Sequence, residues 1–381
     1  MLEAIRSLER WLDAHDWKAY EPHDGLDTPV RALLGRNRTA LLALKQLVMR
    51  SPVNLRPLLR IPRQTSPEAV GFFARGYIRL HQALGATEDR VRAERQLEAL
   101  AQRSESGYSG HCWGNQFDYI TRFFYLPRGT PIVVWTAHNA HAFLDAYEHL
   151  RDSRWRDVAV SAATFIQQDL VREADGTLYI SYVPTGAHPV HNANVLGAGL
   201  LARIGALTGR TEFLSVARRA VEYTVTHQRP DGSWWYGEAP RLRWVDNFHT
   251  GYVLESLLTY QTCSGDRSFA PSVALGLDYY VRTFFQPDGT PRYYADRTYP
   301  LDIQCAAQSI ETLRLFSAST PALAARARQV AGWTIRHLRD PGGYFYFRRS
   351  RRWTARVPLL HWGQATMFSA LAGLLQPEVR D

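Results

Sequence analysis

The segment WVDNFHTGYVLESLLTY, residues 244–260, decides the fold because it joins a polar cluster, Asp246-Asn247-x-His249, to a helix pattern that is apolar on most faces. A helix that is apolar nearly all round is buried on every side. Similar clusters recur at His138-Asn139-x-His141, His191-Asn192-x-Asn194, Asp302-x-Gln304 and His361-Trp362-x-Gln364. Successive clusters begin 53, 55, 56 and 59 residues apart, which indicates one repeated supersecondary unit.

Each cluster is preceded by a Gly turn and an aromatic, strand-like segment, such as PDGSWWYGEA at 230–239 and PGGYFYF at 341–347. Each buried helix pattern is followed by a more charged, amphipathic segment, such as TEFLSVARRAVEYTVTHQ at 211–228, which is typical of an outer helix with one wet face. Residues 67–84 and 87–103 add an inner and outer pair without a cluster. The sixth outer helix is expected at 1–16 or near 38–50.

Six inner helices surrounded by outer helices predict an all-α fold, an (α/α)6 toroid of six helical hairpins. Short β-hairpin-like loops should gather at one end of a funnel. We expect a single domain over residues 1–381. The Pro-rich segment 18–66 lacks the repeat and is expected to form a partly extended N-terminal arm over one face.

The composition, 381 residues with 45% hydrophobic content, allows a large core. The first 20 residues have no apolar signal core, and no stretch approaches roughly 18 uninterrupted apolar residues, so we expect a cytoplasmic protein without a transmembrane segment. Cys112, Cys263 and Cys305 are widely dispersed and are expected to be core thiols. His138 and His141 have a chelating spacing, but no second ligand pair supports a metal, and no nucleotide-binding fingerprint predicts a cofactor.

The net charge of +9 and the pI near 9.6 suit an anionic partner. Acidic glycans, phosphorylated lipids, membrane surfaces and nucleic acid all fit this charge, and we favour an anionic poly- or oligosaccharide over nucleic acid. Almost all basic residues are Arg, with Lys only at Lys18 and Lys45. Such a skew can also arise from genome base composition.

The clusters predict a polar ring at the funnel, because residues three apart share one helix face. Capping of helix N-termini by Asp246, Asn247 and Asp302 is the structural alternative. We expect catalytic acid and base roles for Asp246, His249, His191 and His138. Expected substrate-binding residues are Asn139, His141, Asn194, Gln304, Asp302, His361, Gln364, Trp234, Trp235, Tyr236, Trp244, Arg243 and Asp118. The aromatic faces suit sugar rings, and Arg122 and Arg243 suit carboxylates.

Two reactions fit such a ring. Proton abstraction beside a uronic-acid carboxylate, by a lyase or a C5 epimerase, needs His or Tyr as acid and base with Asn, Gln or Arg on the carboxylate. Glycoside hydrolysis needs two carboxyl groups, for which Asp246 could pair with Asp118, Glu238 or Asp302. The abundance of His and Asn favours proton abstraction. A non-catalytic glycan-binding component of a polysaccharide assembly complex is the third possibility.

The repeat of Gly turn, aromatic strand and buried helix resembles the α/α-toroid superfamily of six-hairpin glycosidases, polysaccharide lyases, uronyl epimerases and terpene-cyclase toroids. The chain has no DxDD-type acid and no aspartate-rich diphosphate motif, which argues against terpene cyclisation. PDGSWWYG, WVDNFHTGYVLESL and RSPVNLRPLL resemble the toroid proteins of bacterial polysaccharide-biosynthesis loci. That resemblance covers most of the chain and implies a role in making or tailoring a surface glycan.

Overall fold

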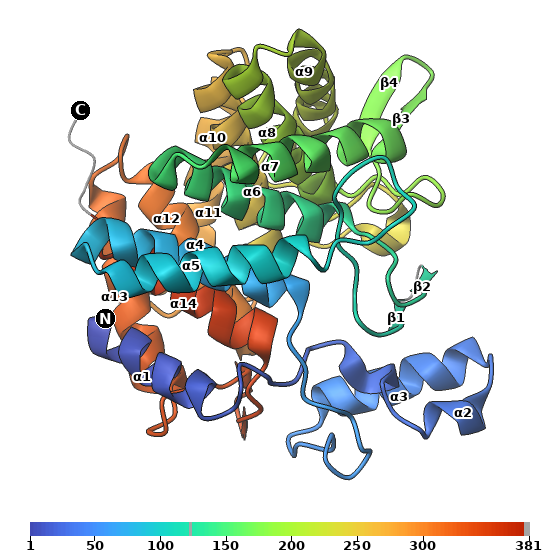
Figure 1. The fold of residues 1–381 in the computed structure, drawn as a ribbon, viewed down its shortest axis with the longest axis vertical. Helices are drawn as coiled ribbons and strands as arrows, with labels where there is room; N and C mark the ends of the chain where they lie inside the picture. Colours follow the sequence, from blue (N-terminus) through green and yellow to red (C-terminus); the bar gives the residue numbers. More distant parts are fainter. Residues whose placement is uncertain (122–123, 377–381) are drawn as a thin grey trace.

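A computed structural model describes residues 1–121 and 124–376, and its centre is a ring of inner helices (Figure 1). Each inner helix contacts the next, and the last closes the ring on the first. In chain order they are α4 (Pro67–Leu84), α6 (Val133–Leu150), α8 (His191–Thr208), α10 (Asn247–Ser264), α12 (Ile303–Phe316), and the π-helical turn η4 (Leu360–Ala365) continued by α14 (Thr366–Gly373).

The outer helices surround this ring and alternate with the inner helices along the chain. They are α1 (Leu2–Asp13), α5 (Thr87–Ala101), α7 (Ser153–Phe165), α9 (Thr211–Thr226), α11 (Ala270–Thr283) and α13 (Ala322–Leu338). The inner helices are buried and the outer helices expose one face to solvent, which confirms the predicted (α/α)6 toroid.

The glycine turns show why α1 is the sixth outer helix. Gly232 and Gly343 have φ angles of 94° and 107°, which side chains rarely tolerate. A Cβ atom at Gly232 would lie 2.5 Å from the carbonyl oxygen of Leu275 on α11, and one at Gly343 would lie 2.5 Å from that of Ser7 on α1. Each turn therefore presses on an outer helix, and α1 takes the equivalent place in the last repeat.

The inner helices repeat more regularly than the polar clusters. The last five begin at 133, 191, 247, 303 and 360, which are 58, 56, 56 and 57 residues apart. The clusters, in contrast, do not occupy equivalent positions. Asp246 and Asp302 are N-caps, His191 is the first residue of its helix, His361 is the second and His138 is the sixth. The prediction that each cluster places its first and last residues in the funnel is therefore wrong in register.

The strands are short and antiparallel, and they precede inner helices. β1 (Tyr119–Ile120) pairs with β2 (Tyr125–Leu126), β3 (Val171–Ala174) with β4 (Thr177–Ile180), and β6 (Arg348–Arg349) lies between β5 (Leu301–Asp302) and β7 (Thr354–Ala355). The π-helical turn η2 (Ile166–Leu170) and the 3-10 turn η3 (Pro240–Leu242) complete the connections.

The arm, residues 18–66, contains η1 (Asp24–Leu26), α2 (Arg31–Leu34) and α3 (Arg38–Arg50). Figure 1 shows α2 and α3 outside the ring, below β1 and β2. An isolated bridge from Ala19 to Gln64 joins the two ends of the arm, and a second bridge from Tyr20 to Leu359 ties the arm to the toroid. A buried ion pair, with Arg56 Nε 2.9 Å from Asp24 Oδ2, closes the arm on itself. Within the described residues, no helix has the length and apolarity that a bilayer crossing requires.

Candidate functional site

The second residue of every inner helix lines one cavity of about 300 Å³ at the N-terminal ends of the ring. We call it the funnel cavity. These six residues are Glu68, Val134, Asn192, Phe248, Gln304 and His361. One position repeated around the ring therefore builds the cavity, as expected when six equivalent helices point their N-termini at a common axis. Next to these residues, Trp135, His249 and Trp362 occupy the third position.

The loops and the arm complete the funnel cavity. Aromatic side chains form much of its wall, including Tyr119, Tyr182, Tyr236, Trp244 and Tyr293. The arm contributes Glu21, His23, Lys45 and Gln46. The arm is thus part of the candidate site, although it lies outside the repeat.

Unpaired polar atoms concentrate on this lining. Eight of its residues carry a buried nitrogen or oxygen without a hydrogen-bond partner in the described part of the chain. They are Glu21, His23, Gln46, Glu68, Asn115, His138, Asn192 and Gln304. A buried polar atom without a partner costs about 1–3 kcal/mol, so native proteins keep few of them. A cluster of such atoms around one cavity indicates a site built for a ligand with many hydroxyl groups.

His249 is oriented toward the funnel cavity by Asp246. Nδ1 of His249 lies 2.7 Å from Oδ2 of Asp246, and the other carboxylate oxygen caps α10 by accepting the His249 backbone N–H at 3.0 Å. Trp244 Nε1 donates to the same Oδ2 at 3.0 Å. An ionised carboxylate can only accept, so Nδ1 is the donor of this bond, and Nε2 is the nitrogen that can act as an acceptor when the ring is neutral. This Asp–His pair has the arrangement of a general base.

His138 and His361 both pack against the Phe72 ring, with centroid distances of 5.0 Å and 5.8 Å. Burial lowers the pKa of His138 to about 3, and Arg75 and His361 act in the same direction. Burial also lowers the pKa of His361 to about 3. Both rings are therefore neutral at pH 7 and can donate and accept hydrogen bonds.

Glu21 from the arm and Glu68 from α4 bring two buried carboxyl groups to the same wall. Burial raises the pKa of Glu21 to about 8, with a further contribution from Asp24. Burial raises the pKa of Glu68 well above its usual range, and the charge of Glu21 adds to the effect. At neutral pH this wall therefore presents protonated carboxyl groups, which can donate to a substrate oxygen.

The Glu21 carboxyl makes the stability of the protein depend on pH. Its pKa is higher in the folded chain than in the unfolded chain, so the folded state holds an extra proton between about pH 4.5 and about pH 8. The free energy of unfolding should therefore fall as pH rises through this window. Urea titrations at several pH values measure this dependence. Glu21→Gln should flatten it, and an unchanged slope in that variant would contradict the assignment.

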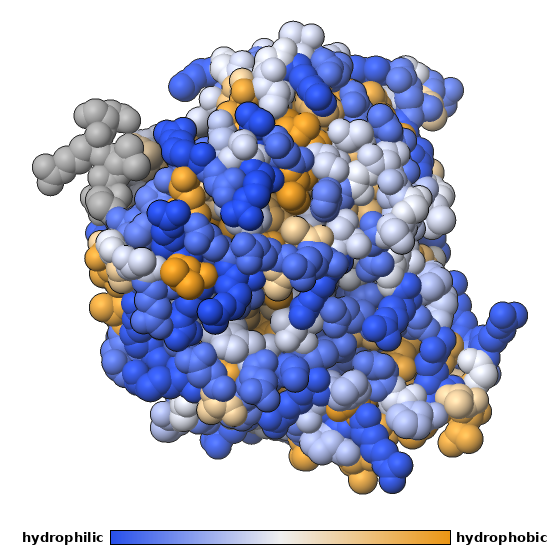
Figure 2. Space-filling model, in the orientation of Figure 1, coloured by the Kyte–Doolittle hydropathy of each residue, from blue (hydrophilic) through white to orange (hydrophobic). Residues whose placement is uncertain are grey.

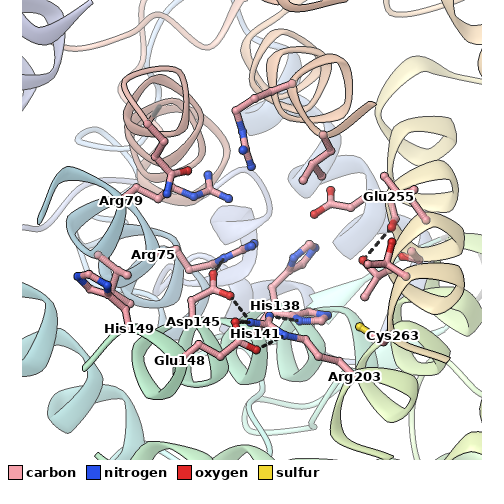
Figure 3. A pocket seen from close by; sticks show the side chains of 18 of the residues that line it. Arg75, Arg79, His138, His141, Asp145, Glu148, His149, Arg203, Glu255 and Cys263 are labelled. Carbon is pink, nitrogen blue, oxygen red and sulfur yellow. Dashed lines mark hydrogen bonds and ion pairs between the residues drawn. The ribbon is translucent and has the colours of Figure 1, made fainter. Parts of the chain in front are cut away.

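A second cavity of about 740 Å³ lies at the opposite end of the lumen, near the C-terminal ends of the inner helices (Figure 3). We call it the axial cavity. Its charged side chains point toward one another, and its ion pairs join Arg75 to Asp145 and Arg203 to both Asp145 and Glu148. His138 lines both cavities and lies between them. Within the described residues, His138 is the one residue of this lining with a buried polar atom that lacks a hydrogen-bond partner.

The chain matches no protein-family model and no curated protein. Solved structures do match. A cellobiose 2-epimerase from Bacillus thermoamylovorans is similar, with a TM-score of 0.63, 9% identity and coverage of 82% of this chain and 90% of that chain. A GH76 α-mannanase from Bacteroides thetaiotaomicron has a TM-score of 0.64, 12% identity and coverage of 81% and 86%. A D-mannose isomerase has a TM-score of 0.60, 13% identity and coverage of 81% and 86%.

The chain shares the α/α toroid fold of these solved structures. At these identities the likeness establishes the toroid and no activity.

Six predicted site residues line the funnel cavity of the toroid: His138, His249, His361, Gln304, Tyr236 and Trp244. Asp246 lies directly behind His249. Gln304 donates from Nε2 to the Tyr252 hydroxyl at 2.6 Å and keeps a free carbonyl oxygen. Tyr236 stacks on Trp244 with a centroid distance of 4.4 Å, which gives the wall a flat aromatic face.

Other predicted residues are buried behind the wall and hold the toroid together. Asn194 accepts from the Ile180 backbone N–H at 2.8 Å and donates to Ala220 O, and Gln364 makes the same kind of link to Phe345. His191 donates from Nε2 to Glu238 at 2.9 Å. Asn139 packs against Gly71, and Trp234 donates to Thr224 O. These side chains do not line the funnel cavity, so neither the catalytic role expected for His191 nor the binding roles expected for the others fit their positions.

The remaining predicted residues lie elsewhere. His141 lines the axial cavity beside Arg203. Asp302 caps α12 and forms an ion pair with Arg348. Arg243 lies over Trp235, 4.4 Å from its ring centroid and away from the funnel cavity. Asp118 pairs with Arg31 and Tyr125 near the arm. Arg122 lies outside the described residues.

The hydrolytic pairs expected from the sequence are not assembled at the funnel cavity. Asp246 accepts from Trp244 and from both His249 nitrogens named above, Glu238 pairs with His191, and Asp302 pairs with Arg348. None of these carboxylates lines the funnel cavity. Two of them therefore cannot flank one glycosidic oxygen there without rearrangement. Among the described residues, no group of three or more His, Cys, Asp or Glu side chains is placed to hold a metal ion.

Sequence reasoning missed Glu21, His23, Lys45, Glu68 and Asn192. Asn192 lies inside a quoted cluster but at its second position, and Glu68 is the second residue of the one inner helix without a cluster. The six helix starts, once aligned, would have identified both. The arm residues carry no repeat signal, and only the folded chain brings them to the funnel cavity.

Proposed function

We propose that this chain is a carbohydrate-active enzyme that moves a proton at the carbon beside a sugar carbonyl, as a sugar epimerase or isomerase does. The observation that carries the proposal is the set of eight unpaired polar atoms around an aromatic-walled cavity of about 300 Å³. Aromatic faces stack on the C–H faces of sugars, and sugar hydroxyls would satisfy the polar atoms. The names of the similar toroids, a sugar epimerase, a sugar isomerase and a mannanase, support a carbohydrate substrate.

In this mechanism Nε2 of His249 takes the proton from the carbon beside the open-chain carbonyl. The electron pair of the C–H bond forms a carbon–carbon double bond, and the carbonyl oxygen becomes an enediolate oxygen. A protonated carboxyl group of Glu21 or Glu68 donates to that oxygen. Return of a proton to the same carbon from the opposite face gives the epimer, and return to the neighbouring carbon gives the isomer.

The lining favours an uncharged sugar over the uronate expected from the basic charge of the chain. Lys45 is the one Lys or Arg of this lining within the described residues, and burial lowers its pKa to about 8. The nearby His138 and His361 are neutral. A uronate carboxylate would therefore meet few compensating charges. Tailoring of a bacterial polysaccharide, which the motif resemblance implies, remains compatible with a neutral oligosaccharide.

Deuterium uptake tests the proposal. The protein is incubated in D₂O with mannose, glucose, cellobiose and a uronic-acid oligosaccharide, and the products are followed by NMR and mass spectrometry. We expect one deuterium at the carbon beside the carbonyl of a neutral sugar, with formation of its epimer or isomer.

Three results would contradict it. A new reducing end without deuterium would indicate hydrolysis, and uptake or unsaturation confined to the uronate would favour the anionic substrate. Saturable binding without covalent change on long incubation would favour a glycan-binding role.

A further inference from the structure

Exposed apolar side chains concentrate on the arm. Within the described residues, the four large apolar side chains with the highest exposed fractions all belong to it: Leu33 at 85%, Leu58 at 80%, Val53 at 66% and Leu47 at 58%. Outside the arm the highest value is 47%, at Trp353. Single exposed apolar residues are ordinary on a protein surface, but several within one short segment mark an interaction site.

The same segment accounts for most of the net positive charge of the chain. Residues 18–66 contain nine Lys and Arg and three Asp and Glu, so the arm has a net charge of +6 out of +9 for the whole chain. Glu21 and Asp24 are buried and Asp27 is half-buried. The exposed cations are Lys18, Arg36, Arg38, Arg50, Arg60 and Arg63. The fully exposed charges of the arm are thus all positive.

This combination fits one kind of partner better than others. Nucleic acid would use the arginines but leaves exposed leucines unexplained, and an apolar protein partner leaves the unbalanced charge unexplained. A bilayer with anionic headgroups uses both, because apolar side chains enter the boundary below the phosphates that cations contact. Figure 2 shows apolar side chains among strongly hydrophilic ones at the lower right edge, where Figure 1 draws the arm.

We infer that the arm docks the protein onto the surface of an anionic phospholipid bilayer, with Leu33, Val53 and Leu58 entering the headgroup boundary and the exposed arginines contacting phosphates. The arm also supplies Glu21, His23 and Lys45 to the funnel cavity. Docking would therefore hold the cavity beside the membrane, within reach of a saccharide attached to a lipid. This consequence for the substrate rests on the proposed function, whereas the docking does not.

Vesicle binding of the full chain tests the inference. We expect co-sedimentation with vesicles of phosphatidylglycerol and phosphatidylcholine, weak binding to phosphatidylcholine alone, and weakening as salt rises. The double variant Leu33→Gln with Leu58→Gln should weaken binding at least about tenfold, since a buried leucine side chain contributes roughly that factor or more. Arg36→Gln with Arg38→Gln should weaken it and reduce its salt dependence.

The matched control is Leu84→Gln with Leu275→Gln, which removes two exposed leucines from α4 and α11 of the toroid. Circular dichroism checks that each variant is folded. The inference is overturned if the chain does not bind anionic vesicles, or if the control loses as much binding as the arm variant. It is also overturned if Leu33→Gln with Leu58→Gln leaves vesicle binding unchanged and instead dissociates a dimer of the chain or weakens its binding to RNA. The vesicle assay contains no sugar, so absence of vesicle binding would not bear on the deuterium experiment that tests the proposed function.

Discussion

Replacing His249 with alanine should lower the rate of deuterium exchange into the substrate by about 10²–10⁴-fold, the range that a positioned general base contributes. His249 is one of the few funnel-lining side chains whose orientation is set by an ionised partner. Its Nδ1 is held by Asp246 at 2.7 Å, which leaves Nε2 as the ring nitrogen that can take a proton from a substrate. Alanine removes that acceptor and leaves the cap between Asp246 and the backbone of α10 in place. The loss should therefore appear in kcat more than in KM.

Two further variants make this result specific. His149→Ala removes a histidine from the axial cavity and should leave the exchange rate unchanged. Asp246→Asn keeps an oxygen for the helix cap but removes the charge that holds Nδ1 of His249, so this variant should also lower the exchange rate. If His249→Ala exchanges deuterium at the normal rate, the base is another residue, and His361→Ala becomes the variant to measure.

The fold could be predicted from the sequence because the evidence for it is local. The apolar pattern of 250–260, the Gly turn at 230–233 and the amphipathic pattern of 211–226 each reflect packing within one repeat, and the repeat occurs often enough to count. The local patterns did not decide whether residues 1–16 or residues near 38–50 form the sixth outer helix. That choice depended on the contact between the Gly343 turn and Ser7, which are at opposite ends of the chain.

The site was only partly predictable, because facing the cavity depends on where each helix begins. Capping was offered as an alternative for Asp246 and Asp302, and the structure has both as N-caps. Two residues after those caps lie Phe248 and Gln304, which line the cavity. Three residues after His191 lies Asn194, which is two residues past the lining residue Asn192 and is buried behind the wall. An error of one residue in the predicted helix start rotates every side chain by about 100° around the helix axis. A residue expected to line the cavity can then face the surrounding helices instead.

The charges inside the ring could not be interpreted from sequence at all. Arg79 on α4 donates to Glu311 on α12 at 2.6 Å and 3.0 Å, and to the backbone oxygen of Ser369 on α14 at 2.9 Å. Arg314 donates to the same carboxylate at 2.8 Å. Burial opposes ionisation of Glu311, but Arg314 and Arg79 outweigh it and hold the pKa of this carboxyl well below its usual range. Arg79, Glu311 and Ser369 are far apart in the chain, and their contacts join the first, fifth and last inner helices.

Replacing Glu311 with alanine should therefore lower the free energy of unfolding by about 3–5 kcal/mol, the usual cost of breaking a buried ion pair by removing one partner. The variant leaves the buried Arg79 without a carboxylate at the place where α14 closes the ring on α4. Urea denaturation followed by circular dichroism measures the change. Glu148→Ala is the control, because Glu148 is about half exposed and its ion pair with Arg203 should contribute at most about 1 kcal/mol. Equal effects in the two variants would mean that burial of the Glu311 pair does not stabilise the closure, and that the apolar contacts of α14 hold the ring by themselves.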